Sequence, residues 1–194
     1  MKDWNKLYEY VLGGLKQKLP PHLTYHNVEH TLHVLKMSEY IAREENVSED
    51  EILLIKTAAL FHDKGFIHSD EDHEEKGVAI AKKLLPDFGY NEDEIEKISG
   101  MIRATAIPQN QKTLSEKILA DADLEYLGTD DFIPIGNNLF AELKYKYPSL
   151  TIEKWNEIQI DFLKTHRYHT DFCIKNRTQK KEDNLKSLLK GSQQ

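Results

Sequence analysis

The stretch Ser48–Gly65, SEDEILLIKTAALFHDKG, decides the fold that the sequence predicts. Ser48 can cap a helix, and acidic residues follow in the first turn. The middle of the stretch runs apolar through Ile52, Leu53, Ile55, Ala58, Ala59 and Leu60, which predicts an apolar helix. The helix then ends abruptly in His62-Asp63, and Gly65 can act as a stop. This end could place an imidazole and a carboxylate beside a divalent cation, or it could be a C-cap histidine next to a solvated aspartate.

Helical periodicity extends over most of the 194 residues. Apolar residues recur at intervals of three and four in WNKLYEYVLGGLKQKL, HTLHVLKMSEYIAREEN and SEKILADADLEYLG. Asn91 and Ser115 are predicted helix caps, and no segment alternates as a strand would. We expect an all-α fold of eight or nine helices in one compact domain over residues 1–194. The motif-bearing core would span about 25–128, and further helices would follow over 129–190.

The composition argues against several classes of protein. A single cysteine, Cys173, excludes an internal disulfide and a cysteine-rich zinc site, and it fits a reducing compartment. The net charge is −7 and the main basic region lies near the C-terminus, so we expect no specific binding of nucleic acid. No stretch approaches the roughly 18 apolar residues of a membrane span, and the N-terminus lacks the apolar run of a signal peptide. We therefore expect a cytoplasmic protein without a membrane partner.

The stretch Tyr25–Val34, YHNVEHTLHV, is a second feature, because it holds three histidines in one predicted helix. His26 and His30 are four residues apart and would share a helix face, so both imidazoles could converge on one ion. Alternatively, one would bind the ion while the other faces a substrate. His33 lies near the same face or points outward. Without a metal, the three histidines would form a polar helix face.

The same stretch contains HNVEH, which matches the H-x-x-E-H motif of inverted zinc peptidases. In that interpretation Glu29 would be the general base. It gives no role to the His62-Asp63 pair, and it needs a much larger scaffold. It is therefore the least favoured alternative.

Two aspartates interrupt an apolar helix in KILADADLEYLG, residues 117–128. Asp121 lies three residues after Ile118 and three before Leu124, which places its carboxylate on or near the buried side. A buried carboxylate needs a cation or several hydrogen-bond donors to offset its lost hydration. The cation could be a metal ion, and the alternative is a salt bridge to a nearby lysine or arginine. Asp123 is the other candidate in this segment.

Taken together, the features form an ordered set of His30, His62-Asp63 and Asp121 on three predicted helices. This set resembles the HD-domain metal-dependent phosphohydrolases, whose pattern is a histidine, then a His-Asp doublet, then a distant aspartate. YHNVEH also looks like the Y-H-N-x-x-H of cyclic-nucleotide phosphodiesterases, which are distant relatives with the same metal-binding plan. The resemblance covers about residues 25–128.

The resemblance implies a site for one or two divalent ions, with Mn, Mg, Fe, Zn, Co and Ni as candidates. The ligands it implies for the first ion are His30, His62, Asp63 and Asp121. Asp121 matches the last ligand better than Asp123, because it lies six residues before Leu127, which closes the helix. His73, at the predicted start of a helix in SDEDHEEKG, matches a position that holds a second ion in binuclear members; by itself it would be an exposed helix start.

The resemblance also implies catalytic roles. His26 matches the phosphodiesterase histidine that protonates the leaving oxygen, and Asp63 would serve both metal binding and catalysis. Lys64 could steady a phosphate oxygen or be a solvated side chain, and Arg103 has the same two alternatives. The implied reaction is hydrolysis of a phosphoester by metal-activated water.

We therefore expect a metal-dependent phosphomonoesterase or phosphodiesterase that acts on a small phosphorylated molecule, with a nucleotide as the favoured class. Gln159 and Phe162 are three residues apart on a late helix, but this spacing is common and does not indicate the base clamp of the phosphodiesterases. A di-iron oxygenase on the same fold stays an alternative, with His33, His68 or His73 as extra ligands. A non-catalytic regulatory domain that binds metal or nucleotide is another. Whether the chain forms a homodimer also stays open.

Overall fold

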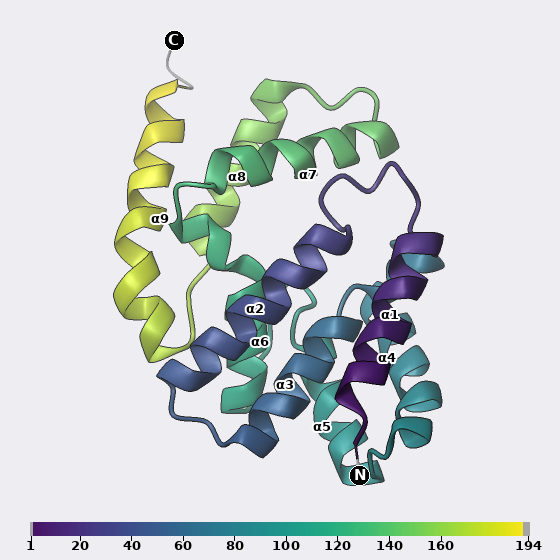
Figure 1. The fold of residues 1–194 in the computed structure, drawn as a ribbon. Coiled ribbons are helices and arrows are strands. Elements are labelled where there is room, and N and C mark those ends of the chain that lie inside the picture. The colour runs from purple at the N-terminus through teal and green to yellow at the C-terminus, as the bar shows by residue number, and fades with distance from the viewer. Residues whose placement is uncertain (1, 192–194) are drawn as a thin grey trace.

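The computed structural model describes residues 2–191 (Figure 1). In this range the chain forms nine α-helices and no strand, so the prediction of an all-α fold is confirmed. The α-helices are α1 (Trp4–Lys18), α2 (Val28–Glu44), α3 (Glu49–Phe61), α4 (His73–Leu84), α5 (Glu92–Arg103), α6 (Leu114–Leu124), α7 (Phe132–Lys146), α8 (Ile152–Thr165) and α9 (Asp171–Gly191). Three short 3-10 helices are η1 (Lys64–Ile67), η2 (Leu85–Phe88) and η3 (Glu125–Gly128).

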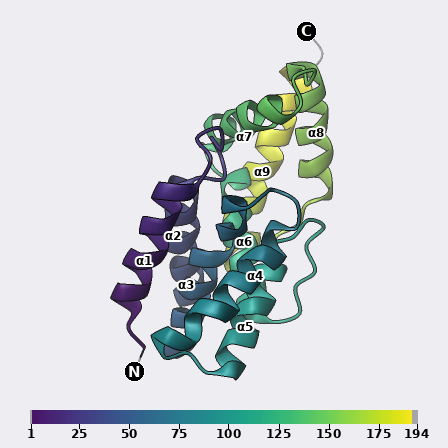
Figure 2. The same cartoon turned by 90° about the vertical axis from the view of Figure 1, so that its right-hand side faces the viewer.

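Helix α2 lies at the centre of the arrangement and packs against both α3 and α6 (Figure 1). Helices α1 and α4 also contact α3, and α4 packs in turn on α5. At the opposite end of the molecule α7 and α8 lie together, and α9 runs along α8 and η3 (Figure 2). The segments that the sequence analysis links to metal binding therefore lie in the central bundle, and α7 and α8 cover one end of it.

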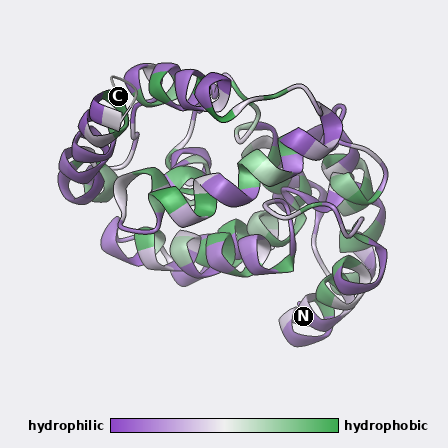
Figure 3. Ribbon diagram, turned by 90° about the horizontal axis from the view of Figure 1, so that it is seen from above, coloured by the Kyte–Doolittle hydropathy of each residue, from purple (hydrophilic) through white to green (hydrophobic). Residues whose placement is uncertain are grey.

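Helix α3 is enclosed by its neighbours, which explains its almost continuous apolar sequence. Ile55, Leu60 and Phe61 are fully buried, and α1, α2, α4, α5 and α6 all contact this helix. By contrast, α9 is largely hydrophilic (Figure 3), and its buried residues are Cys173 and Lys181. The buried helix α3 thus gives the residues at its C-terminal end a rigid support.

A second, smaller apolar cluster lies where α7 and α8 meet the end of α6. It includes Leu124, Leu127, Phe132 and Leu163 and is separate from the main core around α3. Tyr25, just before α2, belongs to this smaller cluster.

No helix of residues 2–191 is long and apolar enough to cross a membrane. The most apolar helix, α3, has 13 residues, whereas a membrane-spanning helix needs roughly 20. Its apolar surface is covered by other helices of the same chain.

The helix caps agree with the sequence predictions at two of three positions. Ser48 caps α3, and Asn91 caps α5 in a reciprocal capping box. The predicted cap at Ser115 is wrong, because α6 begins at Leu114 and its N-cap is Thr113. Thr113 and Glu116 form the capping box there, so the pattern T-x-x-E was the better start signal.

The prediction that His26 and His30 share one face of a helix is also wrong. Helix α2 begins at Val28, and Asn27 is its N-cap, because the Asn27 side chain accepts a hydrogen bond of 3.0 Å from the His30 backbone N–H. His26 therefore precedes the helix. Its position is set by the loop that enters α2 rather than by helical spacing.

Helix α4 approaches the C-terminal end of α3 closely at Gly77. A Cβ atom at this position would lie 2.7 Å from the carbonyl oxygen of Phe61 and 3.4 Å from that of His62. Both are backbone atoms, so no side-chain rotation could relieve the contact. The lack of a side chain at Gly77 therefore allows α4 to lie against the end of α3 that carries His62 and Asp63.

We expect Gly77→Ala to lower the free energy of unfolding by about 1–3 kcal/mol, because the added methyl group must displace α4 from α3. Gly13→Ala is the matched control: Gly13 is also helical, but a Cβ atom there would meet nothing within 4 Å. Alanine at Gly13 should raise the free energy of unfolding by up to about 1 kcal/mol through its helix propensity. Urea denaturation measures both changes, and equal effects would contradict the close approach at Gly77.

Candidate metal centre

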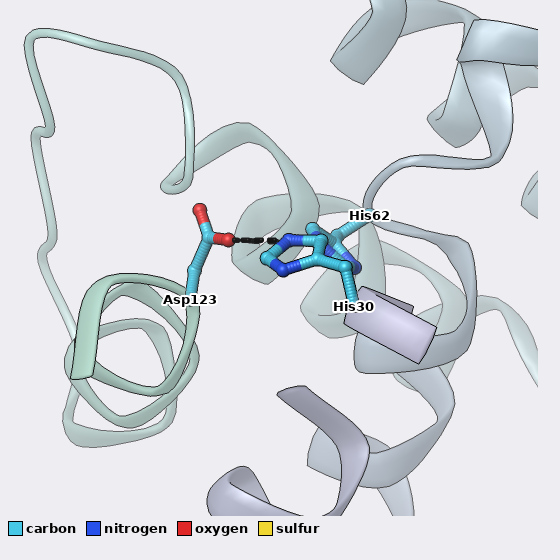
Figure 4. A group of neighbouring side chains, drawn as sticks. All are labelled: His30, His62 and Asp123. Carbon is cyan, nitrogen blue, oxygen red and sulfur yellow. Dashed lines mark hydrogen bonds and ion pairs between the residues drawn. The ribbon is translucent and has the colours of Figure 1, made fainter. Parts of the chain in front are cut away.

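His30, His62 and Asp123 converge from three separate elements (Figure 4). His30 lies in the first turn of α2, His62 follows the last residue of α3, and Asp123 lies near the end of α6. The Nε2 atom of His30 is 3.0 Å from Oδ1 of Asp123 and 3.3 Å from Nε2 of His62. One ligand atom of each residue lies within 4.8 Å of the other two.

Asp63 adds a second carboxylate to this cluster. Its Oδ2 atom lies 3.4 Å from Nε2 of His30 and 3.2 Å from Nε2 of His62. The atom is buried, yet neither imidazole makes a hydrogen bond of acceptable geometry to it, nor does another described residue. A buried carboxylate oxygen without a hydrogen bond is unfavourable unless a cation stabilises it. Asp63 thus marks a place where a positive charge fits.

The spacing and chemistry of these groups suit a divalent cation. Two ligand atoms that bind one zinc ion at about 2.0–2.1 Å in tetrahedral geometry lie roughly 3.3 Å apart, close to the distances around His30. The Nδ1–H of His62 donates to the carbonyl oxygen of Ala59 at 2.8 Å, so in the neutral imidazole the lone pair is on Nε2, which faces the cluster. Two imidazoles and two carboxylates form a ligand set that Zn, Mn, Fe and related ions accept.

The electrostatics of the cluster also favour a positive charge. Burial alone would lower the pKa of His62, but the neighbouring Asp63 carboxylate outweighs it and raises this pKa to about 9. Asp63 is buried too, yet the adjacent imidazoles hold the pKa of its carboxyl well below the ordinary value. The carboxylates of Asp63 and Asp123 thus stabilise a proton on the His62 imidazole, whose Nε2 atom faces the cluster.

Asp121 lies outside the cluster, contrary to the sequence expectation. Its buried carboxylate accepts hydrogen bonds from the backbone N–H groups of His169 and Thr170 and from the Thr170 hydroxyl, at 2.7–3.1 Å. Asp121 and Asp123 are two residues apart on α6, so their side chains point roughly 200° apart around the helix. Asp121 therefore faces the start of α9, and Asp123 faces the histidines. The alternative of several donors, rather than a cation, explains the burial of Asp121.

His73 lies beside the second oxygen of Asp63. Its Nε2 atom is 3.6 Å from Oδ1 of Asp63 and 3.3 Å from Oε1 of Glu74, and its Nδ1–H donates to the carbonyl oxygen of Asp70 at 3.2 Å. The two oxygens of Asp63 thus face different imidazoles. This close approach needs Gly65, because a Cβ atom there would lie 1.9 Å from the backbone oxygen of His73.

His26 is held next to the cluster by Glu142 of α7. The Nδ1–H of His26 donates to Oε1 of Glu142 at 2.5 Å, and the backbone N–H groups of Tyr25 and His26 donate to the other carboxylate oxygen. The imidazole also stacks on the Phe66 ring, with 4.2 Å between centroids. Burial alone would lower the pKa of His26, but Glu142 and the charge of Asp63 raise it above the ordinary value. The raised pKa increases the fraction of His26 that is protonated at a given pH, and Nε2 is the ring nitrogen that does not face Glu142.

Glu142 is a candidate functional residue that no motif indicates. It lies three residues after Leu139 on α7, and it is buried with an exposed fraction of 7%. A carboxylate on the inward face of an amphipathic helix was the available signal, since such a group needs a partner. The sequence does not show which partner that is.

The two basic residues that the sequence offers for a phosphate lie elsewhere. The Lys64 ammonium is 3.4 Å from the carbonyl oxygen of Val11 in α1, and burial lowers its pKa to about 8. Arg103 pairs with Glu75 at the surface of α4 and α5. The expectation that Lys64 acts in the same site as Asp63 is therefore corrected, because consecutive side chains at this helix end point to different sides.

The other residues weighed in the sequence also lie apart from the cluster. Glu29, the base of the peptidase alternative, is exposed on α2. His33 faces Glu125, with 3.4 Å between Nε2 and Oε2, and Glu125 also pairs with Arg177. His68 is exposed. Of the three extra histidines that an oxygenase could use, His73 is the one that approaches Asp63.

A cavity of about 260 Å³ opens at the cluster. At one end it is lined by His26, Asp63, His73 and Asp123. The walls away from the cluster are mainly apolar and come largely from η3, α7 and α8. Gln159 and Phe162, whose spacing alone indicates nothing, both line this cavity. The structure thus joins the candidate metal centre to a partly open cavity with room for a small molecule.

The two aspartates of α6 should respond differently to substitution by asparagine. Asp121→Asn should lower the free energy of unfolding by roughly 1–3 kcal/mol, because it weakens the buried hydrogen bonds to the start of α9, and it should leave metal affinity unchanged. Asp123→Asn should lower metal affinity by more than about 100-fold and change the stability of the metal-free protein by less than about 1 kcal/mol. Calorimetric titration with Mn²⁺ and urea denaturation in EDTA measure the two effects. Loss of metal in Asp121→Asn at unchanged stability would reverse the assignment.

Comparison with known proteins places this geometry in a family. A model of the HD domain matches residues 27–125, just over half of the chain. An uncharacterized protein of Clostridium beijerinckii is 36% identical over 76 residues, which are 38% of this chain and 48% of that protein. The match thus spans about half the length of that curated relative.

Three solved structures share the fold at low sequence identity. A predicted HD superfamily hydrolase from an uncultured Thermotogales bacterium is 23% identical, with a TM-score of 0.60 over 95% of this chain and 88% of the other. A protein from Lactobacillus plantarum is 15% identical, with a TM-score of 0.66 over 98% of both chains. Bacillus subtilis YpgQ, solved in complex with ADP, is 20% identical, with a TM-score of 0.61 over 97% of this chain and 96% of the other. The chain therefore belongs to the HD-domain family.

Proposed function

We propose that this protein hydrolyses a phosphoester of a small molecule, with a nucleotide as the favoured substrate class. The observation that carries the proposal is the cluster of His30, His62, Asp63 and Asp123 at the end of a cavity, with His26 held beside it by a buried carboxylate. The cluster suits a cation, and the cavity has room for a small organic group. The ADP bound to YpgQ supports the nucleotide class.

His30, His62, Asp63 and Asp123 would hold the first divalent ion. When bound, such an ion polarises a phosphoryl oxygen and lowers the pKa of a nearby water molecule. The four side chains fix this charge at the inner end of the cavity, because α2, α3 and α6 pack tightly around it. The structure favours Asp123 over Asp121 as the last ligand, since the Asp121 carboxylate is already satisfied by His169 and Thr170.

His73 and Asp63 would hold a second ion. The Oδ2 atom of Asp63 faces His30, and its Oδ1 atom faces His73, so the carboxylate presents one oxygen to each imidazole. Glu74 adds an oxygen 3.3 Å from the same His73 nitrogen. The donors are imidazoles and carboxylates, which accept Mn, Fe, Zn, Co, Ni or Mg, so metal analysis must decide the native ion.

His26 would donate a proton to the leaving oxygen. Its ring is fixed by Glu142 on one side and by Phe66 on its face, and it lines the same cavity as Asp63 and Asp123. Glu142 accepts a hydrogen bond from the Nδ1–H of His26. Nε2 is therefore the nitrogen that would give a proton to the departing alkoxide. Proton donation by a positioned histidine typically contributes about 10²–10⁴-fold to the rate.

The proposal predicts metal-dependent phosphate release. Protein purified without chelator should contain one or two divalent ions per chain. It should hydrolyse a generic phosphodiester or at least one member of a nucleotide panel. EDTA should abolish this activity, and Mn²⁺ or another divalent ion should restore it. Elemental analysis and phosphate release test this. Two irons without phosphate release would favour the di-iron oxygenase. A well-folded protein that binds no divalent ion would contradict the proposal and leave a regulatory domain.

His26→Ala should lower kcat by about 10²–10⁴-fold and leave the metal content unchanged, because it removes the proton donor and no ligand. His33→Ala is the matched control, since His33 lies in the same stretch but faces Glu125 instead of the cavity. It should change kcat by less than about threefold. Steady-state kinetics with metal analysis measure both variants, and an unchanged rate in His26→Ala would rule out its role as proton donor.

Glu142→Gln should reduce kcat less than His26→Ala, and it should shift the limb of the pH–rate profile that reports the acid to lower pH. The reason is that Glu142 raises the pKa of His26, and glutamine carries no charge to sustain that effect. A lower rate without a shift of the profile would show that Glu142 contributes to folding alone.

A further inference from the structure

A separate cavity of about 440 Å³ is lined by residues of α1, η1 and α4. It shares no lining residue with the cavity at the cluster. Its polar lining consists of Tyr10, Gln17, Lys18, Lys64 and His68, together with the acidic residue Glu9. The described lining of the cavity at the cluster contains neither lysine nor arginine, whereas this one contains two lysines. We call it the lysine cavity.

Lys64 is a buried cation without a carboxylate partner. Its exposed fraction is 6%, and the one hydrogen bond that its ammonium makes within residues 2–191 is a bond of 3.4 Å to the carbonyl oxygen of Val11. No described carboxylate forms an ion pair within 4.0 Å of the ammonium of Lys64 or of Lys18. Burial and the positive charge of Lys18 both lower the pKa of Lys64, so the neighbouring charge opposes the ammonium instead of stabilising it.

Two buried glutamates show the arrangement that is usual for a charge inside a protein. Glu142 accepts a hydrogen bond from His26, and Glu125 pairs with Arg177. An ammonium has three donors, and burying it without matching acceptors is unfavourable. Lys64 therefore has donors left for an acceptor that the described part of the chain does not provide.

The Gly13-Gly14 pair of α1 leaves space beside the Lys64 ammonium. A Cβ atom at Gly14 would lie 3.3 Å from Nζ of Lys64, and one at Gly13 would meet nothing within 4 Å. Both glycines line the lysine cavity. Glycine is unfavourable inside a helix, so helix propensity does not account for two in succession. The ammonium thus lies beside a part of α1 that carries no side chains, where a ligand can approach it.

We propose that the lysine cavity binds an anionic phosphoryl group, with Lys64 as its buried donor and Lys18 as a second, exposed cation. A phosphoryl group carries one to two negative charges near neutral pH, and its oxygens accept the hydrogen bonds that Lys64 lacks. The apolar side chains of Ile67, Ile80 and Leu84 also line the cavity, which favours a phosphorylated organic molecule over inorganic phosphate. The inference does not depend on the proposed function, because no residue of the candidate metal centre lines this cavity.

Calorimetric titration of the full chain with phenylphosphonate, inorganic phosphate and acetate tests the proposal. Each titration is done with Mn²⁺ bound and after divalent ions have been removed and the chelator dialysed away. Binding to the lysine cavity needs no metal, so it should persist in both conditions. Inorganic phosphate should bind at least about tenfold more tightly than acetate, because it has more charge and more acceptors. Phenylphosphonate should bind about three- to tenfold more tightly than inorganic phosphate, because part of its ring leaves water.

A charge deletion assigns the metal-independent binding to Lys64. Lys64→Met keeps a long apolar side chain and removes the charge, so it should weaken the binding of both phosphoryl compounds by more than about tenfold. Lys16→Met is the matched control, since Lys16 is an exposed lysine of α1 that does not line the cavity. It should change these affinities by less than about twofold.

A carboxylate placed inside the cavity is a second, independent test. Gly14→Asp brings an acidic side chain next to Nζ of Lys64, because the Cβ atom would lie 3.3 Å from it. This internal anion should replace the ligand, abolish the metal-independent binding and raise the midpoint of thermal unfolding by about 2–4 °C relative to Gly14→Asn. Gly14→Asn is the matched control, because it has the same shape without the charge.

Phosphoryl binding that disappears when the metal is removed, or that survives Lys64→Met, would overturn the inference. Equal affinities for acetate and phosphate would reject the phosphoryl class. A Gly14→Asp variant that binds phenylphosphonate as well as Gly14→Asn does, with the same unfolding midpoint, would also contradict the assignment. Equal affinities for phenylphosphonate and inorganic phosphate, with both lost in Lys64→Met, would support the site and identify inorganic phosphate as its ligand.

Discussion

The buried Asp63 carboxylate at the end of α3 is the constraint on which the rest of the site depends. A carboxylate in this position is unfavourable unless positive charge surrounds it, and the structure brings the imidazoles of His30, His62 and His73 to its two oxygens. This arrangement requires α2 and α4 to lie tightly against the end of α3. Gly77 allows the close approach of α4, so the packing of the core and the geometry of the site have a common origin.

Helix α6 connects the fold to the site through two aspartates that face opposite sides. Asp121 receives hydrogen bonds from His169 and Thr170 and so fixes the start of α9, whereas Asp123 faces His30. Both carboxylates are removed from bulk water, and each is stabilised by a different kind of partner. One aspartate therefore supports the structure and the other extends the candidate metal centre, although only Ala122 separates them in the chain.

The C-terminal helices contribute parts of the site that lie outside the HD-domain match. Helix α7 provides Glu142, which holds His26, and α7 and α8 provide most of the apolar wall of the cavity. The family match ends at residue 125, before these helices begin. The cavity at the cluster is therefore built jointly by the core that matches the HD domain and by helices outside it.

The sequence by itself determined the all-α class, the buried helix α3 with His62-Asp63 at its end, and the HD-domain family, because these depend on local periodicity and on a short ordered motif. Only the tertiary structure shows that Asp123, and not Asp121, faces His30, because both lie on one helix and the sequence does not say which side meets α2. The direction of Lys64, the partner of His26 and the location of Gln159 and Phe162 in the cavity wall depend on tertiary structure in the same way. Each depends on contacts between residues far apart in the chain, such as Glu142 with His26, and helical periodicity contains no information about which distant helix a side chain will meet.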